Sequence, residues 1–350
     1  MKLAVPLMVG GTAVVSPGIK DALMSFLNTR YHLGLPLDTP WYVGLLLTQS
    51  AVVVYFYDEH GARRDRAVAA AKPPGMFVAL HHQSFDPPSR RLPDRAVPTR
   101  LGHRTIRHVE CDQSPFFSGG MADPAGAVHQ QDRMVSDLSA IRRADPDAAI
   151  GYYGIVHVPL QLLAGCSVST WHEVALFELN RTDKQRRELG DGRGPDLGLT
   201  VQTVSRPSRP VAAVIRIAIS YDVPLADVAE AVEGPFEDIR VAIAPPRIDA
   251  VTHYTQVEMI CTAFRRILDD LQARLGKDTI VHVFYAGPVS LGFSLGRRIS
   301  RTIHHRVQVH NYNAHATPRY AWGIEVNGEA GAMPAIVKPA QSNAPSAGSP

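Results

Sequence analysis

Two segments of this chain look like copies of each other, and this duplication limits the possible folds more than any other feature of the sequence. Residues 148–180 and 279–313 each read as a buried apolar strand, a tight turn with Gly and Pro, a short helix that reaches a Gly, and a second strand that ends in Asn. A strand, a crossover helix and another buried strand pack as a parallel sheet with helices on its faces. The chain is therefore expected to contain two such sheets.

The match between the two segments can be followed residue by residue. The final strands align at a constant spacing of 133 positions, which pairs His172, Val174 and Asn180 with His305, Val307 and Asn313. The turns align with a small insertion, which pairs Gly154 with Gly287 and Pro159 with Pro288.

The repeat extends upstream of both segments. The corresponding elements are the strands 75–84 and 211–220 and the amphipathic helices 123–143 and 255–275. Each strand is followed by an aromatic residue and Asp, Phe85-Asp86 and Tyr221-Asp222, at a spacing of 136 positions. This period is much longer than the roughly 20–50 residues of a solenoid repeat. The predicted fold class is therefore α/β, with two fused Rossmann-like halves that form a pseudo-dimer.

Composition shifts suggest the boundaries of these halves. A Gly-rich polar stretch follows the first copy, and the C-terminal end is rich in Ala, Pro and Ser. The expected organisation is an N-terminal segment 1–60 packed on or leading into the first half, a first half 61–185, a linker 186–210, a second half 211–328 and a disordered tail 329–350.

The overall composition is that of a globular protein. Of its 350 residues, 45% are hydrophobic and 20% charged, and the net charge of +3 is too weak to predict duplex DNA binding. The three Cys residues are far apart, which favours neither a disulfide framework nor a zinc site and makes a reducing cytoplasm the expected location. The apolar run 41–57 is too short, and too polar at its middle, for a membrane span.

The two turns of the repeat are the candidate ligand site. Open parallel sheets bind ligands beyond the carboxyl ends of their strands, where helices begin with free N–H groups. The turns 152–157 and 285–290 both offer an aromatic residue, a Gly and a helix start. Paired across a pseudo-twofold axis, they would make one site suited to a ligand with repeated nucleotides. The alternative is that the aromatics only pack and the glycines only turn the chain.

The second copy resembles the C-terminal signature of the SAVED domain, a sensor built from two CARF-like halves. The residues that carry the resemblance are Tyr285, Pro288, Gly296, Arg297 and Tyr312, and in the first copy Tyr153, Gly154, His157, Pro159 and Gly165. It covers roughly residues 70–325. The resemblance implies recognition of a cyclic oligonucleotide made by bacterial antiviral systems of the CBASS or type III CRISPR kind, and control of an effector. Residues 1–60 depart from the family pattern, because they show no nuclease, TIR, protease or membrane effector motif.

The predicted ligand-binding residues combine these turns with nearby aromatic and basic side chains. They are Tyr153, Gly154, His157, Trp171, Arg181, Lys184, Tyr285, Ala286, Gly287, Pro288, Ser290, Arg297 and Tyr312. Base stacking is expected from the aromatics and phosphate contacts from the basic side chains. For the basic residues, a solvated surface position is the alternative.

Nothing in the sequence indicates a catalytic centre. No GxSxG, P-loop or HExxH motif occurs, and 287–296 lacks the order of an NAD-binding loop. Adjacent histidines such as His81-His82 point to opposite faces of a strand, so no metal and no cofactor is expected.

The prediction is a non-enzymatic sensor that binds a cyclic tri- or tetranucleotide and then associates with itself or with a separate effector subunit. Two alternatives stay open: a ring nuclease of the same fold that degrades the ligand, and a nucleic-acid-binding or nucleolytic effector that uses the Arg-rich region 62–107.

Overall fold

The computed structural model describes Thr29 and residues 75–85, 105–119, 122–181, 185–329 and 331–338. The chain divides into two compact units, 1–73 and 74–350, and every helix and strand named below belongs to the second. The expected N-terminal segment 1–60 lies outside the described residues apart from Thr29, as does most of the Arg-rich region 62–107.

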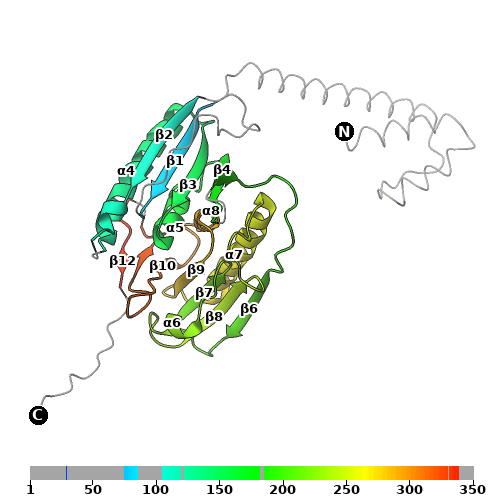
Figure 1. Cartoon of the computed structure of the whole chain (residues 1–350). Helices are drawn as coiled ribbons and strands as arrows, with labels where there is room; N and C mark the ends of the chain where they lie inside the picture. The colour runs from blue at the N-terminus through cyan, green and yellow to red at the C-terminus, as the bar shows by residue number, and fades with distance from the viewer. Residues whose placement is uncertain are drawn as a thin grey trace, which may run out of the picture. The chain divides into compact units, whose positions relative to one another are not determined.

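The first half is a five-stranded sheet with two main helices (Figure 1). Its strands run in the order β2-β1-β3-β4-β5, with β5 antiparallel to four parallel strands. The elements are β1 (Phe77–Gln83), β2 (Ile106–Asp112), the 3-10 helix η3 (Ser114–Phe116), α4 (Pro124–Ala144), β3 (Ala149–Ile155), α5 (Val158–Ser167), β4 (Val174–Leu179) and β5 (Arg186–Glu188). The Asp123 carboxylate caps α4 by accepting the Gly126 N–H, as the sequence predicts.

The second half is a seven-stranded sheet in the order β12-β11-β10-β9-β7-β8-β6. Its elements are β6 (Thr200–Ser205), β7 (Ala212–Ala218), α6 (Leu225–Ala229), β8 (Phe236–Ala242), α7 (Tyr254–Arg274), β9 (Ile280–Ala286), α8 (Val289–Gly296), β10 (Arg306–Asn311), β11 (Trp322–Glu325) and β12 (Ile336–Val337). The apolar stripe of α7 is buried along its length, as its 3.6-residue spacing predicts.

The strand order confirms two fused copies of one fold. The parallel core β2-β1-β3-β4 of the first half has the same order as β8-β7-β9-β10 of the second. Ala149 and Ile280 begin the central strands 131 positions apart, and Val174 and Val307 lie 133 positions apart in the last parallel strands.

This geometry corrects the predicted alignment of the turns. The central strands both have seven residues, and the helices after them have His157 and Pro288 as N-caps, again 131 positions apart. His157 therefore corresponds to Pro288, and the pairing of Gly154 with Gly287 and Pro159 with Pro288 was wrong. The two extra residues of the second copy lie later, between α8 and β10.

The two halves meet through α5 and α8, which lie between the sheets (Figure 1). A Cβ on Gly165 would lie 1.9 Å from the carbonyl oxygen of Phe293, and a Cβ on Gly296 would lie 2.0 Å from that of Leu162. Gly165 and Gly296 are 131 positions apart, as are Leu162 and Phe293, so the two contacts are equivalent and the helix crossing is itself symmetric. These two glycines let the helix backbones touch, and one hydrophobic core runs through both halves.

Two expectations about irregular segments differ from the structure. The predicted linker 186–210 holds β5 and β6, and the predicted disordered tail holds β12, in which Val337 pairs with Gly323. These short edge strands are held by backbone hydrogen bonds. All six residues of β6 are exposed, so no buried face marks this strand in the sequence. Among the described residues, no helix is long and apolar enough to cross a membrane.

Candidate ligand-binding site

The carboxyl ends of the two sheets meet on one face of the protein, which we call the carboxyl-end face. Arg181, after β4, donates from Nη1 to the Tyr221 hydroxyl, after β7, across 3.4 Å. At another point of the same boundary, the Phe117 ring after β2 stacks on Trp322 of β11, with 5.8 Å between ring centroids. Trp322 pairs with Asn311, the last residue of β10. The strand ends of both halves thus contribute to one surface.

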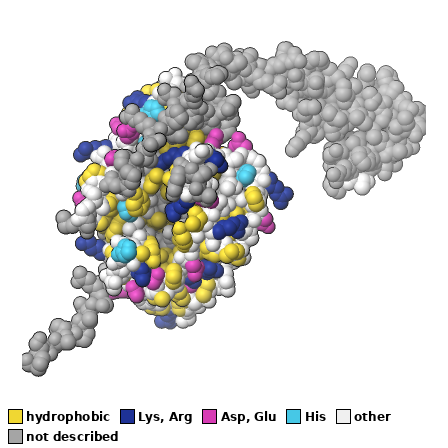
Figure 2. Space-filling model, viewed as in Figure 1, with side chains coloured by type: hydrophobic (Ala, Val, Ile, Leu, Met, Phe, Trp, Pro, Cys, Tyr) yellow, Lys and Arg dark blue, Asp and Glu magenta, His cyan; other side chains and the backbone are white. Residues whose placement is uncertain are grey.

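Exposed aromatic side chains mark this face. Phe85, Tyr221 and Tyr312 are 45%, 51% and 44% exposed, and they are the aromatic members of the exposed large hydrophobic residues in the described chain. They follow β1, β7 and β10, at the carboxyl end of each strand. Over the surface seen in Figure 2, hydrophobic side chains are interspersed with Lys, Arg, Asp and Glu side chains. Exposed rings beside cations can stack on bases and pair with phosphates.

Phe85 and Tyr221 follow the corresponding strands β1 and β7, with one more residue between the strand and the ring in the second half. The Ser84 N–H donates to the Ile155 carbonyl, and the Ser220 N–H donates to the Ala286 carbonyl, at the last residues of the corresponding strands β3 and β9. An aromatic residue follows each serine. The Ser-aromatic-Asp repeat in the sequence marks both residues as candidates for the site, although the sequence analysis uses it only to align the halves.

His157 lies in an aromatic cluster on the first half's side of the face. Its ring stacks against Phe85 at 4.1 Å and lies 4.2 Å from Phe117 and 6.0 Å from Trp322, measured between centroids. The Ser84 hydroxyl oxygen lies 2.6 Å from His157 Nδ1 and accepts the His157 backbone N–H. Burial lowers the pKa of His157 to about 4. The imidazole is therefore neutral at pH 7 and offers a stacking surface, without positive charge for a phosphate.

The N-terminus of α8 is already occupied by a carboxylate from the other half. Glu178 of β4 accepts the Ser290 N–H at 3.0 Å. Burial raises the pKa of the Glu178 carboxyl, while hydrogen bonds from Ser290 and Val289 act in the opposite direction. The predicted use of this helix start for a ligand phosphate therefore conflicts with an internal contact, because Glu178 already takes the position of the anion.

Two predicted stacking residues have no open ring face. Tyr153 is 1% exposed and stacks between Phe177 and His81, at centroid distances of 4.1 Å and 5.4 Å. Tyr285 is 4% exposed, and its hydroxyl donates to the Pro288 carbonyl at 2.7 Å. Both residues stabilise the turns, so the packing interpretation holds for them in this structure.

The small residues of the two turns lie close together where the halves meet. A Cβ on Gly154 would lie 2.6 Å from Val289 of α8, and one on Gly287 would lie 2.4 Å from the Tyr285 hydroxyl. The Ala286 carbonyl accepts the N–H groups of both Ile219 and Ser220. These residues shape the backbone beneath the carboxyl-end face.

The remaining predicted residues are divided between two ends of the molecule. Arg181 and Tyr312 belong to the carboxyl-end face. Arg297 donates to the Trp171 carbonyl at the other end of α5 and α8, so these two residues lie away from the strand ends that they were predicted to line. Lys184 lies outside the described residues.

The buried histidines do not form a metal site. His81 lies 3.1 Å from His108 on one face of the first sheet, whereas His82 contacts Gln113 and Tyr152 on the other. Among the described residues, no group of three or more His, Cys, Asp or Glu side chains could hold a metal ion.

A comparison with protein-family models decides the family. The SAVED model, "SMODS-associated and fused to various effectors sensor domain", matches residues 132–326, more than half of the chain. The chain belongs to the SAVED family. The matched region includes the α5–α8 crossing and both central strands, which agrees with two fused CARF-like halves.

Solved SAVED/CARF-domain receptors match the chain at low sequence identity. The Acinetobacter baumannii Cap4 SAVED/CARF-domain containing receptor with the cyclic trinucleotide 2′3′3′-cAAA is 10% identical with a TM-score of 0.42, and the match covers 85% of this chain and 64% of the receptor. The Moraxella osloensis Cap4 receptor is 12% identical with a TM-score of 0.40, covering 85% and 63%. The chain thus spans less than two thirds of the length of these two receptors. No curated protein sequence matches it.

Proposed function

We propose that this SAVED protein is a sensor that binds a cyclic oligonucleotide on the carboxyl-end face. The observation that carries the proposal is the placement of Phe85, Tyr221 and Tyr312, three half-exposed aromatics at strand carboxyl ends drawn from both halves. Burying such rings against bases is favourable by about 1–3 kcal/mol per base. In the absence of a ligand, the rings remain in contact with water.

The symmetry of the face suits a ring-shaped ligand with repeated units. The aromatics that follow the corresponding strands β1 and β7, Phe85 and Tyr221, would each take one base, and Tyr312 a third. Exposed Arg181 and Arg247, which follow β4 and β8, would pair with the phosphates between the bases. The cyclic trinucleotide in the Acinetobacter receptor structure supports this ligand class.

Binding would be transmitted through the boundary between the halves. Arg181 joins Tyr221 across that boundary, and the same β4 strand supplies Glu178 to the start of α8. A ligand that contacts both halves would favour one arrangement of α5 against α8. We propose that this change drives association of the chain with itself or with a separate effector subunit in bacterial antiviral defence, within the cytoplasm.

The experiment is titration calorimetry of the full chain with cyclic tri-adenylate, mixed cyclic trinucleotides and cyclic tetra-adenylate. Binding of at least one of them at micromolar concentration is expected, and no heat from any ligand at tens of micromolar would refute the proposal. Chromatography of the mixture after incubation tests the ring-nuclease alternative. The proposed sensor leaves the ligand intact, so no linear product is expected, and its appearance would favour the ring nuclease.

A further inference from the structure

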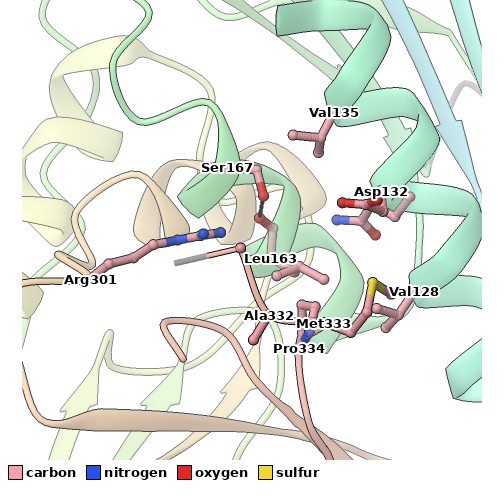
Figure 3. Close-up of a pocket in the computed structure, with 11 residues that line it drawn as sticks. Val128, Asp132, Val135, Leu163, Ser167, Arg301, Ala332, Met333 and Pro334 are labelled. Carbon is pink, nitrogen blue, oxygen red and sulfur yellow. Dashed lines mark hydrogen bonds between the residues drawn. The ribbon is translucent and has the colours of Figure 1, made fainter. Parts of the chain in front are cut away.

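A pocket lies away from the carboxyl-end face, between the two halves (Figure 3). Its volume is about 150 Å³. The first half contributes α4 and α5, and the second half contributes Arg301, which follows α8, and the C-terminal segment 331–334. None of the residues proposed to bind the cyclic oligonucleotide lines it.

Two opposite charges face this pocket without pairing to each other. Figure 3 shows the Arg301 guanidinium and the Asp132 carboxylate reaching it from different sides. Within the described residues no ion pair joins either of them to another residue, and the Arg301 side chain also interacts with the buried Cys166 thiol. Both side chains are exposed, so each can exchange bound water for a ligand group.

The other polar groups of the pocket have defined hydrogen bonds. The Ser167 hydroxyl donates to the Leu163 carbonyl at 2.9 Å, which leaves its oxygen as an acceptor. The Gln131 amide donates to the Leu160 carbonyl at 3.1 Å and accepts from Gln113. The pocket therefore presents one strong cationic donor group, Arg301, and one anionic acceptor, Asp132.

The rest of the wall is apolar and of limited size. Val128 and Val135 of α4, Leu163 of α5 and Met333 of the C-terminal segment contribute hydrocarbon surface. A cavity of about 150 Å³ holds a benzene-sized molecule. The ligand that fits these walls therefore carries two opposite charges and one compact apolar group.

We propose that this pocket binds a small zwitterion with a compact apolar side chain, that is, an aliphatic α-amino acid. Its carboxylate pairs with Arg301, its ammonium group pairs with Asp132, and its side chain contacts Val128, Val135 and Leu163. Because the pocket walls come from both halves, the bound ligand also links the loop after α8 to α4 and α5.

The test is saturation-transfer NMR and calorimetry on the full chain with three probes. Leucine carries both charges, 4-methylpentanoate only the carboxylate, and 3-methylbutylamine only the ammonium group. Leucine is expected to bind more tightly than either analogue. Since a charged hydrogen bond contributes about 1.5–3 kcal/mol, Arg301→Gln should weaken leucine and 4-methylpentanoate about tenfold or more and leave the amine unchanged. Asp132→Asn should weaken leucine and the amine and leave 4-methylpentanoate unchanged.

Matched controls are available on the same helix. Arg133→Gln and Asp137→Asn change exposed charges of α4 that do not line the pocket, and they should bind leucine as the wild type does. The proposal is overturned if leucine does not bind at millimolar concentration, or if Arg301→Gln and Asp132→Asn bind it as tightly as the controls.

Discussion

The symmetric contact between α5 and α8 predicts that its two glycines cannot be replaced even by alanine. In Gly165→Ala the new Cβ would lie 1.9 Å from the Phe293 carbonyl oxygen, and in Gly296→Ala 2.0 Å from the Leu162 carbonyl oxygen. The obstructing atoms are backbone, which cannot rotate away as a flexible side chain can. The helices must therefore move apart, and the fully buried Leu160, Leu291 and Phe293 lose packing.

The size of the effect follows from two opposing contributions. Overpacking of a core costs about 1–3 kcal/mol, and a backbone clash belongs at the upper end of that range. Alanine recovers about 1 kcal/mol of helix propensity relative to glycine. Each variant should therefore lose about 2 kcal/mol of unfolding free energy, which lowers Tm by about 4–8 °C for a unit of this size.

Thermal unfolding followed by circular dichroism measures this effect directly. Gly276→Ala is the control, because nothing lies within 4 Å of a Cβ at that position, and its Tm should not fall. The double variant should lose less than the sum of the two single losses, because helices separated by one methyl group accommodate the second. Single variants with the Tm of the control, or strictly additive losses, would show that the helices do not cross in this way.

Three further predictions concern buried polar groups. Burial lowers the pKa of His157 to about 4 and that of His310 to about 3, so these residues stay neutral in the folded chain while the unfolded chain takes up protons near pH 6.5. Unfolding free energy should thus be largest above pH 6.5 and decline as the pH falls towards 4, and equal urea midpoints at pH 7 and pH 5 would contradict this. Asp238→Asn leaves Arg216 buried beside a neutral partner and should lower the unfolding free energy, measured with urea, by about 3–5 kcal/mol. Asp222→Asn, in the exposed pair with Arg240, should lower it by only about 0–1 kcal/mol. Glu178→Ala should lower the unfolding free energy by about 1–3 kcal/mol, because the Ser290 N–H loses its acceptor. Glu178→Gln retains an acceptor, so its unfolding free energy in the same assay should be closer to that of the wild type.

The elements that could be predicted from the sequence are those with local signals. Asp123 caps α4, and the apolar spacing of α7 matches its buried face, because both features depend on residues only a few positions apart. The internal repeat also predicted that the two halves have the same fold. It located the last parallel strands at the correct spacing, since Val174 and Val307 occupy the same register position.

The parts that could not be predicted depend on contacts between distant segments. Tyr153 and Phe85 are both aromatics near a strand's carboxyl end, and only the neighbouring strand and helix decide that the first is buried and the second exposed. Glu178 caps a helix 112 positions away in the other half, which no local pattern reveals. The edge strand β12 exists because β11 offers free backbone groups, and its own sequence resembles that of a loop.

The central claim, that the exposed aromatics of both halves bind one cyclic oligonucleotide, is tested most directly by measuring its affinity for three variants. Phe85→Ala, Tyr221→Ala and Tyr312→Ala should each weaken binding of the best cyclic ligand in calorimetry by about 5- to 150-fold, the equivalent of about 1–3 kcal/mol per stacked base. Met259→Ala, an exposed residue of α7 away from the face, should bind as the wild type does. Unchanged affinity in both Phe85→Ala and Tyr221→Ala would contradict the account.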